Sequence, residues 1–315
     1  MLGRKMFENV IVGVDGRPNG RDAIALASRL IGSAGKLTLA NVHPGASRPV
    51  NATEPEMLTK ERTASHELLE AERSRAEVEA ELVSYASGSP GRGLHDLAEE
   101  TSADLLVVGS CSRGPVGRVL LGDDTRGALN GAPCAVAVAT RGYAEHPHPI
   151  ATVGVGYDGS PESDIALAKA RELAAGNRSL VRVLEVVNIP NYAFTGFGAP
   201  ALGESIEMMI SEADDRLAKL EGVEGRAVYG ISGEELAAFG DEVQLLVVGS
   251  RGYGPMKRLI VGSTSDYLQR HARCSLLVLP RAAAEGDEGD DGNDRPGGVG
   301  DGADTDAGAG SASAT

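Results

Sequence analysis

Several features that would place a sequence in a special class are scarce or absent here. Tryptophan is missing, aromatic residues make up 3% of the 315 residues, and there are three cysteines. With so few rings, the core must consist mainly of Val, Leu, Ile and Ala, which suits parallel sheets buried under helices. The odd number of cysteines (Cys111, Cys134 and Cys274), without framework spacing, argues against a disulfide scaffold and favours a reducing compartment.

Long apolar runs and an excess of basic residues are also missing. No run approaches the ~18 apolar residues of a membrane-spanning helix, and no signal-peptide apolar segment stands near the N-terminus. The 30 Lys and Arg residues are outnumbered by 45 Asp and Glu, so the net charge is −15. A nucleic-acid surface would need clustered Lys and Arg. We therefore expect a cytoplasmic, soluble protein without nucleic-acid or membrane partners.

The sequence alternates short apolar segments, which we predict to be strands, with segments of helical periodicity. Such alternation indicates parallel sheets with right-handed crossovers. The predicted strands are 9–15, 37–42, 78–85, 104–108, 134–139, 152–158, 180–187, 226–231, 245–248 and 276–279. The predicted helices are 21–31, 54–76, 94–101, 123–130, 166–173, 202–221, 236–239 and one that begins at 263–266, with a loop at 87–93.

This order of elements occurs twice. NVIVGVD at 9–15 matches TVGVGYD at 152–158 with an offset of 143, and Gly109 recurs as Gly249 with an offset of 140. A repeat this long indicates a domain duplication, because solenoid periods are only ~20–50 residues. The fold class that we predict is α/β, with two tandem, doubly wound, five-stranded parallel sheets.

We place the two domains at residues 5–142 and 150–282, with the boundary in 141–149, where two prolines disfavour a helix. Residues 283–315 are rich in Gly, Asp, Ala and Ser and cannot bury enough apolar surface to offset the entropy of ordering, so we predict a disordered tail. Nine acids and one arginine lie from Glu285 onward, so this tail carries more than half of the net charge.

The most informative stretch is GSRGYGPMKRLIVGSTS at 249–265, directly after the apolar segment 245–248. Its spacing is G-x2-G-x9-G-S. Glycines let the backbone take positive φ and approach a ligand, and the Gly-Ser pair stands where a helix begins. Free N–H groups and the helix dipole make such a helix start a natural phosphate cradle.

This spacing resembles the nucleotide-binding signature of the universal stress protein family, and the resemblance covers about residues 5–282 in two copies. It implies strand order 3-2-1-4-5, a fold like that of the adenine nucleotide alpha hydrolases, and ATP binding, with or without Mg²⁺, in stress response. It also implies that the fifth strands of the two domains pair, so that the chain is a tandem pseudo-dimer that is monomeric or dimerises again.

The resemblance also assigns residues to the ligand. The acid at the end of the first strand of the second repeat would contact adenosine, a residue at the end of the second strand the base, and the glycine-rich segment the ribose and phosphates. Carried over onto this chain, these are Asp158, Val186, Val248, Gly249, Arg251, Gly252, Gly262, Ser263, Thr264 and Ser265.

The first repeat departs from this pattern in its stretch GSCSRGPVGRVLLGDDT at 109–125. Ser112 stands where the second glycine should be, and Asp123 replaces the serine. An aspartate there would cap the helix, and together with Asp124 it would repel a phosphate. We expect this site to be weakened or lost. Its remaining residues are compatible with a nucleoside: Asp15, Val42, Val108, Gly109 and Gly122.

Each assignment has a purely structural alternative. Asp158 begins an Asp-Gly-Ser-Pro turn, Val186 can be core, and Gly249 and Gly252 can simply let the chain turn. Ser263 can cap its helix.

We identify no catalytic residue and no metal site. Phosphoryl-transfer enzymes use metal-binding carboxylates and a water-positioning residue, and no such set is evident in the sequence. Any ATPase activity should be slow. The alternative to an ATP-binding protein is an interaction module of the same fold that binds no nucleotide. A nicotinamide-dependent enzyme, suggested by G-x-G-x-x-G at 154–159, is disfavoured because its first two glycines lie inside a predicted strand.

Overall fold

The fold is that of a computed structural model, which describes residues 6–44, 54–111, 115–120, 122–188, 199–250, 259 and 262–280. Within these ranges the side chains of 54–58, 123–125 and 199–202 are not described. All of the described residues belong to one compact unit. The predicted disordered tail lies outside the described residues.

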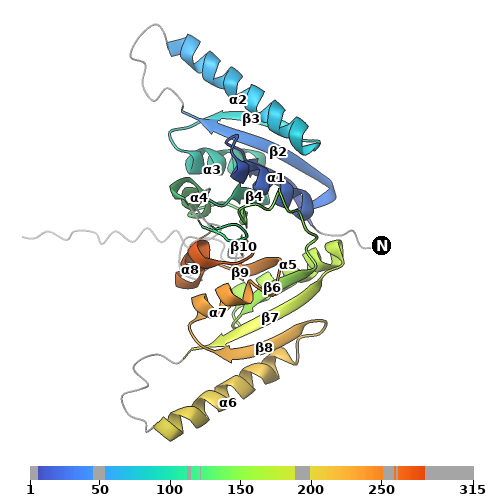
Figure 1. The fold of residues 1–315 in the computed structure, drawn as a ribbon, viewed down its shortest axis with the longest axis vertical. Coiled ribbons are helices and arrows are strands. Elements are labelled where there is room, and N and C mark those ends of the chain that lie inside the picture. Colours follow the sequence, from blue (N-terminus) through green and yellow to red (C-terminus); the bar gives the residue numbers. More distant parts are fainter. Residues whose placement is uncertain are drawn as a thin grey trace, which may run out of the picture. The chain divides into compact units, whose positions relative to one another are not determined.

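The described residues form an α/β structure in which strands and helices alternate (Figure 1). The elements of the first repeat are β1 (Phe7–Gly13), α1 (Pro18–Leu30), β2 (Ile31–His43), α2 (Glu54–Ala76), β3 (Glu81–Ala86), α3 (Pro90–Thr101), β4 (Leu105–Gly109), α4 (Asp123–Leu129) and β5 (Ala135–Ala139). Those of the second are β6 (Thr152–Tyr157), α5 (Pro161–Asn177), β7 (Leu180–Val187), α6 (Ala199–Leu217), β8 (Glu224–Tyr229), α7 (Ser232–Phe239), β9 (Leu245–Gly249), α8 (Ser263–His271) and β10 (Ser275–Leu279).

The ten strands of the described residues belong to one sheet with the order β3-β2-β1-β4-β5-β10-β9-β6-β7-β8. Within each repeat the strands are parallel and follow the predicted order 3-2-1-4-5. The two halves join through β5 and β10, which pair antiparallel with Leu277 opposite Ala137. The predicted pairing of the fifth strands is therefore confirmed. It removes two exposed sheet edges from the middle of the molecule.

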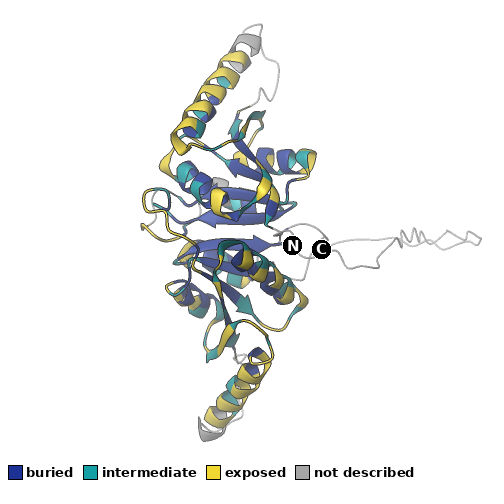
Figure 2. Cartoon of the chain, turned by 90° about the vertical axis from the view of Figure 1, so that its right-hand side faces the viewer, coloured by how far each residue is buried: buried dark blue, intermediate teal, exposed yellow. Residues whose placement is uncertain are grey.

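Apolar side chains fill both faces of this sheet and run across the join. One buried cluster packs α1, α2, α5 and α6 against one face and contains side chains of both repeats, such as Leu105 and Val247. The other cluster packs α3, α4, α7 and α8 against the opposite face. Figure 2 shows the buried strands in the middle and the more exposed α2 and α6 at the two ends of this unit. Within the described part of the chain, no helix is long and apolar enough to cross a membrane.

Prolines explain where two helices begin earlier than predicted. Pro18 starts α1 and Pro90 starts α3, because proline is favoured at the first helical position, where its missing N–H has no intrahelical partner. The loop predicted at 87–93 is therefore wrong in its second half. Ser89 caps α3 by accepting a hydrogen bond from the Arg92 N–H at 3.4 Å.

The connection between the repeats is fastened to the first repeat by a buried carboxylate. Asp22 of α1 is 2% exposed. Its Oδ2 accepts the Gly142 N–H and its Oδ1 accepts the Ala144 N–H, both at 2.8 Å. Burial raises the pKa of Asp22, against the opposing effect of the two backbone hydrogen bonds. Nearby Glu145 raises this pKa further, and Arg141 lowers it.

This raised pKa predicts a pH dependence of stability. A carboxylate whose pKa is higher in the folded than in the unfolded protein favours folding below its ordinary pKa of 3.8, and this contribution is lost as pH rises through the folded pKa. We expect the free energy of unfolding of the wild type, relative to Asp22→Asn, to decrease as pH rises from below 3.8. Urea unfolding of both proteins over this range measures it. If the wild type instead became more stable relative to Asp22→Asn as pH rises, the raised pKa of Asp22 would be contradicted.

Candidate functional site

The main candidate site is a pocket at the carboxyl ends of β6 and β9, where the strand order reverses direction. In open α/β sheets, ligands bind at this switch point. The pocket has a volume of about 320 Å³. Eight of the ten predicted residues line it: Asp158, Val186, Val248, Gly249, Gly262, Ser263, Thr264 and Ser265. The other two, Arg251 and Gly252, lie outside the described residues.

One side of the pocket is a tight turn between β6 and α5. Oδ1 of Asp158 accepts hydrogen bonds from the Ser160 N–H at 3.1 Å and the Ser160 hydroxyl at 2.5 Å. Gly159 has a φ of +75°, which favours glycine. The structural role predicted as an alternative for Asp158 is therefore present. Its Oδ2 accepts no hydrogen bond from any described residue, so one carboxylate oxygen remains available to a ligand.

The opposite side is the start of α8, which has no side-chain cap. Gly262 is the N-cap residue, and Ser263 is the first helical residue, exposed to solvent. The alternative in which Ser263 caps the helix is therefore wrong. Since the first N–H groups of a helix have no intrahelical partner, they can donate to an anion.

The same geometry corrects a prediction for the first repeat. The N-cap residue of α4 is Gly122, without a side-chain cap, and Asp123 is the first helical residue. Asp123 therefore does not cap α4 as predicted. Its backbone position corresponds to that of Ser263, so the sequence still places a negative charge at the start of this helix.

Ser250 adds a second available polar group. Its side chain is 3% exposed, lines the pocket, and its Oγ has no hydrogen-bond partner among the described residues. The corresponding Ser110 of the first repeat is satisfied. Its Oγ donates to the Leu120 carbonyl at 3.0 Å and accepts the Leu120 N–H at 2.7 Å. The two repeats thus differ in the polar capacity of their pockets.

Gly249 has a packing role that was not predicted from the sequence. A Cβ there would lie 2.8 Å from both the Cβ and the carbonyl oxygen of Glu162. At Gly109 a Cβ would lie 2.0 Å from the carbonyl oxygen of Asn19. Gly249 at the end of β9 lets the first turn of α5 pack on that strand, and Gly109 at the end of β4 does the same for α1. This close approach is what brings Glu162 and Asn19 into their pockets.

The first-repeat pocket lies in the equivalent place and is smaller, about 110 Å³. Asp15, Val42, Val108 and Gly109 line it, whereas Gly122 is not among its lining residues. Oδ1 of Asp15 accepts the Arg17 N–H at 3.0 Å, and Oδ2 accepts the Asn19 side-chain amide at 3.4 Å. Both carboxylate oxygens are therefore engaged, unlike those of Asp158.

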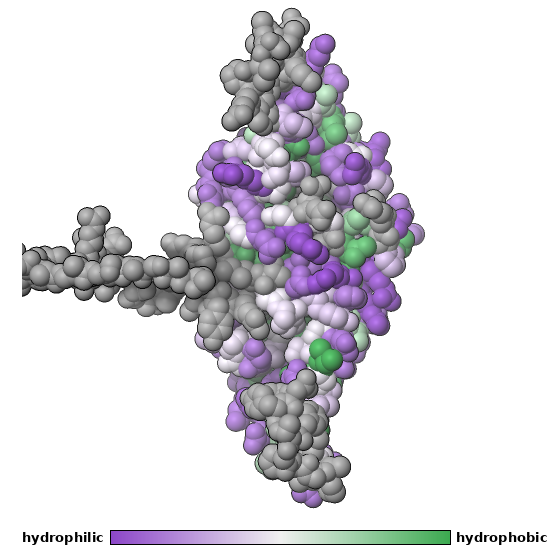
Figure 3. Space-filling model, turned by 90° about the vertical axis from the view of Figure 1, so that its left-hand side faces the viewer, coloured by the Kyte–Doolittle hydropathy of each residue, from purple (hydrophilic) through white to green (hydrophobic). Residues whose placement is uncertain are grey.

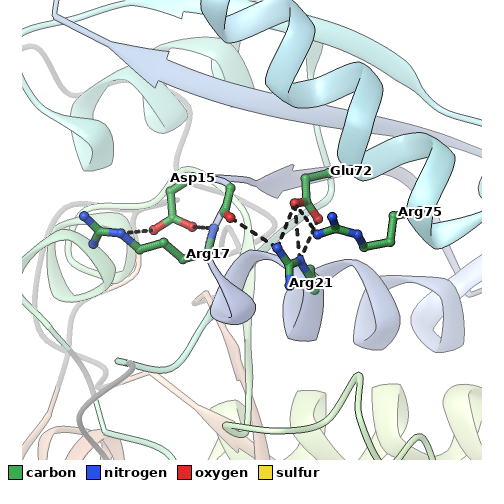
Figure 4. A network of polar contacts seen from close by, with 6 residues as sticks. Asp15, Arg17, Arg21, Glu72 and Arg75 are labelled. Carbon is green, nitrogen blue, oxygen red and sulfur yellow. Dashed lines mark hydrogen bonds and ion pairs between the residues drawn. The ribbon is translucent and has the colours of Figure 1, made fainter.

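A polar network holds the turn after β1 against α2 (Figure 4). Nε of Arg21 lies 3.0 Å from Oε2 of the buried Glu72, and Arg75 lies 3.2 Å from Oε1. Arg21 also donates to the Gly16 carbonyl at 3.4 Å. Because Gly16 directly follows Asp15, this network further restrains the first-repeat pocket.

Comparison with known proteins identifies the family. The sequence model of the universal stress protein family matches residues 6–140 and again 149–280. The chain belongs to this family. A universal stress protein of Mycobacterium tuberculosis is 31% identical over 192 residues, which are 56% of this chain and 61% of the relative. The match thus spans about three fifths of that relative's length.

Two solved structures are also similar. The crystal structure of a universal stress protein from Archaeoglobus fulgidus matches 90% of this chain and 100% of its own, with a TM-score of 0.58 and 17% identity. It supports the fold of both repeats together. A universal stress protein in complex with cAMP matches 44% of this chain and 99% of its own, with a TM-score of 0.32 and 22% identity.

Several pocket residues of this universal stress protein were not predicted from the sequence. The apolar ones are Leu184 and Leu236, and the polar ones include Ser160, Glu162, Ser163, Ser232 and Ser250. Ser160 had a local signal, since it precedes Pro161 and caps α5 by accepting the Ser163 N–H at 3.2 Å. Leu236 and Ser232 had none, because α7 reaches the pocket only through packing over the sheet.

The pocket of this family member is acidic among its described residues. Asp158 and Glu162 line it, whereas no described lysine or arginine does. The described residues contain no group of three His, Cys, Asp or Glu side chains arranged for a metal ion. Cys134 and Cys274 are buried, and burial raises the pKa of each thiol to about 12, so neither is a nucleophile at neutral pH.

Figure 3 shows the side of the molecule that lies on the left in Figure 1. Its coloured surface is mainly hydrophilic, and the apolar residues on it are scattered rather than gathered into one patch. On the coloured part of this side, a protein partner would therefore meet a polar surface.

Proposed function

We propose that this universal stress protein binds an adenine nucleotide, specifically ATP, in the second-repeat pocket and acts as a cytoplasmic stress-response regulator. The observation that carries the proposal is the combination of an apolar wall, an available Asp158 Oδ2 and an uncapped α8 start in one pocket. Its volume of about 320 Å³ is within the ~300–1,000 Å³ typical of small-molecule sites.

Each part of the pocket suits one part of the nucleotide. The apolar side chains of Leu184, Val186 and Leu236 suit a flat base. Oδ2 of Asp158 suits a hydroxyl or amino donor of adenosine. The first N–H groups of α8 and the buried Ser250 hydroxyl suit phosphate oxygens.

Charge makes a cation part of this proposal. Phosphates near the carboxylate of Asp158 would be repelled unless a cation neutralised part of their charge. Mg²⁺ bound to the phosphates supplies that charge, while Arg251 and Gly252 contribute through the glycine-rich segment. The chemistry assigned here is binding, and the proposal includes no hydrolytic step.

The proposal divides the chain by role. Residues 150–282 form the nucleotide-binding domain, and residues 5–142 form a second copy whose pocket is too small, at about 110 Å³, for a nucleotide with phosphates. The proposal gives the acidic segment 283–315 no part in nucleotide binding. The chain as a whole is a pseudo-dimer that satisfies its fifth-strand pairing internally.

Isothermal titration of the full chain with ATP tests this function. We expect a single site with Mg²⁺ and weaker binding without it, and we expect NAD⁺ not to bind. Two sites would show that the first pocket also accepts ATP and would overturn the asymmetry. The absence of ATP binding under both conditions would refute the proposal and favour an interaction module of the same fold.

A further inference from the structure

The segment that follows α4 in the first repeat is hydrogen-bonded to the segment that precedes α8 in the second. The Leu259 N–H donates to the Ala132 carbonyl at 2.9 Å, and the Gly131 N–H donates to the Leu259 carbonyl at 3.0 Å. The reverse contact also exists, since the Val119 N–H donates to the Ala272 carbonyl at 2.9 Å. Positions 119 and 259, like 132 and 272, are 140 apart. The hydrogen bond from Leu259 to Ala132 therefore has an equivalent, from Val119 to Ala272, in which the two repeats change roles.

This contact holds Leu259 firmly. Both its backbone N–H and its carbonyl are bonded to the other repeat, and its side chain is 0% exposed in an apolar cluster. Gly131 has a φ of +84°, a left-handed conformation that favours glycine. A Cβ at this position would come no nearer than 3.9 Å to the His95 ring. Backbone conformation, and not lack of space, is thus what requires glycine.

The anchored residue is close to the nucleotide pocket along the chain. Leu259 stands three residues before Gly262, the N-cap of α8. Three residues span at most ~10 Å, so holding Leu259 restricts where α8 can begin. We propose that Gly131 and Ala132 of the first repeat are positioning residues, which place the start of α8 and so set the affinity of the second-repeat pocket. This inference rests on the proposed nucleotide function.

The consequence is that the second-repeat pocket is completed by the first repeat. The role of the copy with the small pocket is then to hold the binding half in register. A regulator that loosened the first repeat around Gly131 would lower nucleotide affinity without touching the pocket.

Gly131→Val in the full chain tests this inference, because a β-branched residue is strained at a positive φ. We expect ATP binding in the presence of Mg²⁺ to weaken at least tenfold and the Leu259 amide to exchange hydrogen at least tenfold faster. Gly222→Val is the matched control. Gly222 has a φ of +71° and open space around its Cβ, and it lies in the turn before β8. We expect this variant to bind ATP as the wild type does.

Gly131→Asn should keep ATP affinity and hydrogen exchange at Leu259 near the wild-type values, since asparagine tolerates the left-handed region. If the valine variant lost affinity only because its fold is destabilised, the affinity of the variants would instead fall in step with their melting temperatures. Gly131→Ala, with less strain, is the variant to use if the valine protein does not fold. ATP affinity equal to that of the Gly222→Val control, despite faster exchange at Leu259, would overturn the inference. So would unchanged exchange at Leu259. A wild type that binds no ATP would instead refute the proposed function, and the exchange of the Leu259 and Ser263–Ser265 amides would still test the anchoring.

Discussion

Ser263→Asp is expected to weaken ATP binding by 10- to 100-fold while leaving the protein as stable as the wild type or slightly more so. The substitution places in the second repeat the residue type that the first repeat has at the same helix position, Asp123. The added carboxylate should stabilise the helix but repel the phosphates of ATP, so its effects on folding and on binding have opposite signs. A carboxylate in the first turn stabilises a helix by ~0.3–1 kcal/mol through its interaction with the helix dipole.

The same carboxylate opposes the ligand. Two unit charges ~5 Å apart at an effective dielectric constant of ~20 repel by ~3 kcal/mol, and salt screening reduces this value. A loss of ~1.4–2.8 kcal/mol corresponds to the expected 10- to 100-fold change. Ser263 is exposed, so the larger side chain meets no packing constraint.

Isothermal titration and thermal unfolding of the same samples measure both quantities. Ser74→Asp is the control, because Ser74 is an exposed serine on α2, outside the lining of either pocket. It adds the same charge without adding it at a phosphate site. Binding by Ser263→Asp that equals binding by this control would mean that the phosphates lie elsewhere.

Leu277→Ala is expected to lower the free energy of unfolding by ~2–5 kcal/mol, the range for large-to-small substitutions in a well-packed core. Leu277 is 0% exposed on β10 and pairs with Ala137 across the join between the repeats. Its small partner cannot fill the space, since the strands are held at a fixed spacing by their hydrogen bonds.

Because the sheet and both apolar clusters are continuous across the join, the loss should reach both repeats. Hydrogen exchange at Val12 of β1 and Val155 of β6, both 0% exposed, reports each half separately. We expect both amides to lose protection by the same free energy. Leu180→Ala serves as the matched control, because Leu180 is 55% exposed and should cost less than ~0.5 kcal/mol. Loss of protection in the second repeat alone would show that the halves unfold independently.

The local part of the fold was predictable from the sequence. Strand β7 and helix α2 begin and end where the pattern placed them, because a compact apolar run and a long charged periodic segment each have clear ends. Boundaries that depend on packing were missed. β2 extends back to Ile31, where it pairs with Phe7 beyond an irregularity that its own sequence does not reveal.

Part of the candidate site was equally local. The turn at Asp158 and the glycine-serine start of α8 are short motifs, so their positions were predictable, and the pocket brings them together. Glu162 and Ser232 were missed since each enters the pocket through the packing of its helix on the sheet. Ser250 follows Gly249 in the glycine-rich segment, but only the structure shows that its hydroxyl is buried and has no hydrogen-bond partner among the described residues. The capping role expected of Asp123 was wrong because the helix begins one residue earlier than the motif implied.

The sequence by itself determined the duplication, the α/β alternation, the scarcity of aromatic core residues and the difference between the two glycine-rich segments. All of these are patterns within a few tens of residues or between two copies of one pattern. Only the tertiary structure decided that Asp22 fastens the linker, that Gly249 makes room for Glu162, and that Leu259 is held by the other repeat. Each of these contacts joins residues about 90 to 130 positions apart, and such pairs are selected by the packing of helices on a shared sheet rather than by any local propensity.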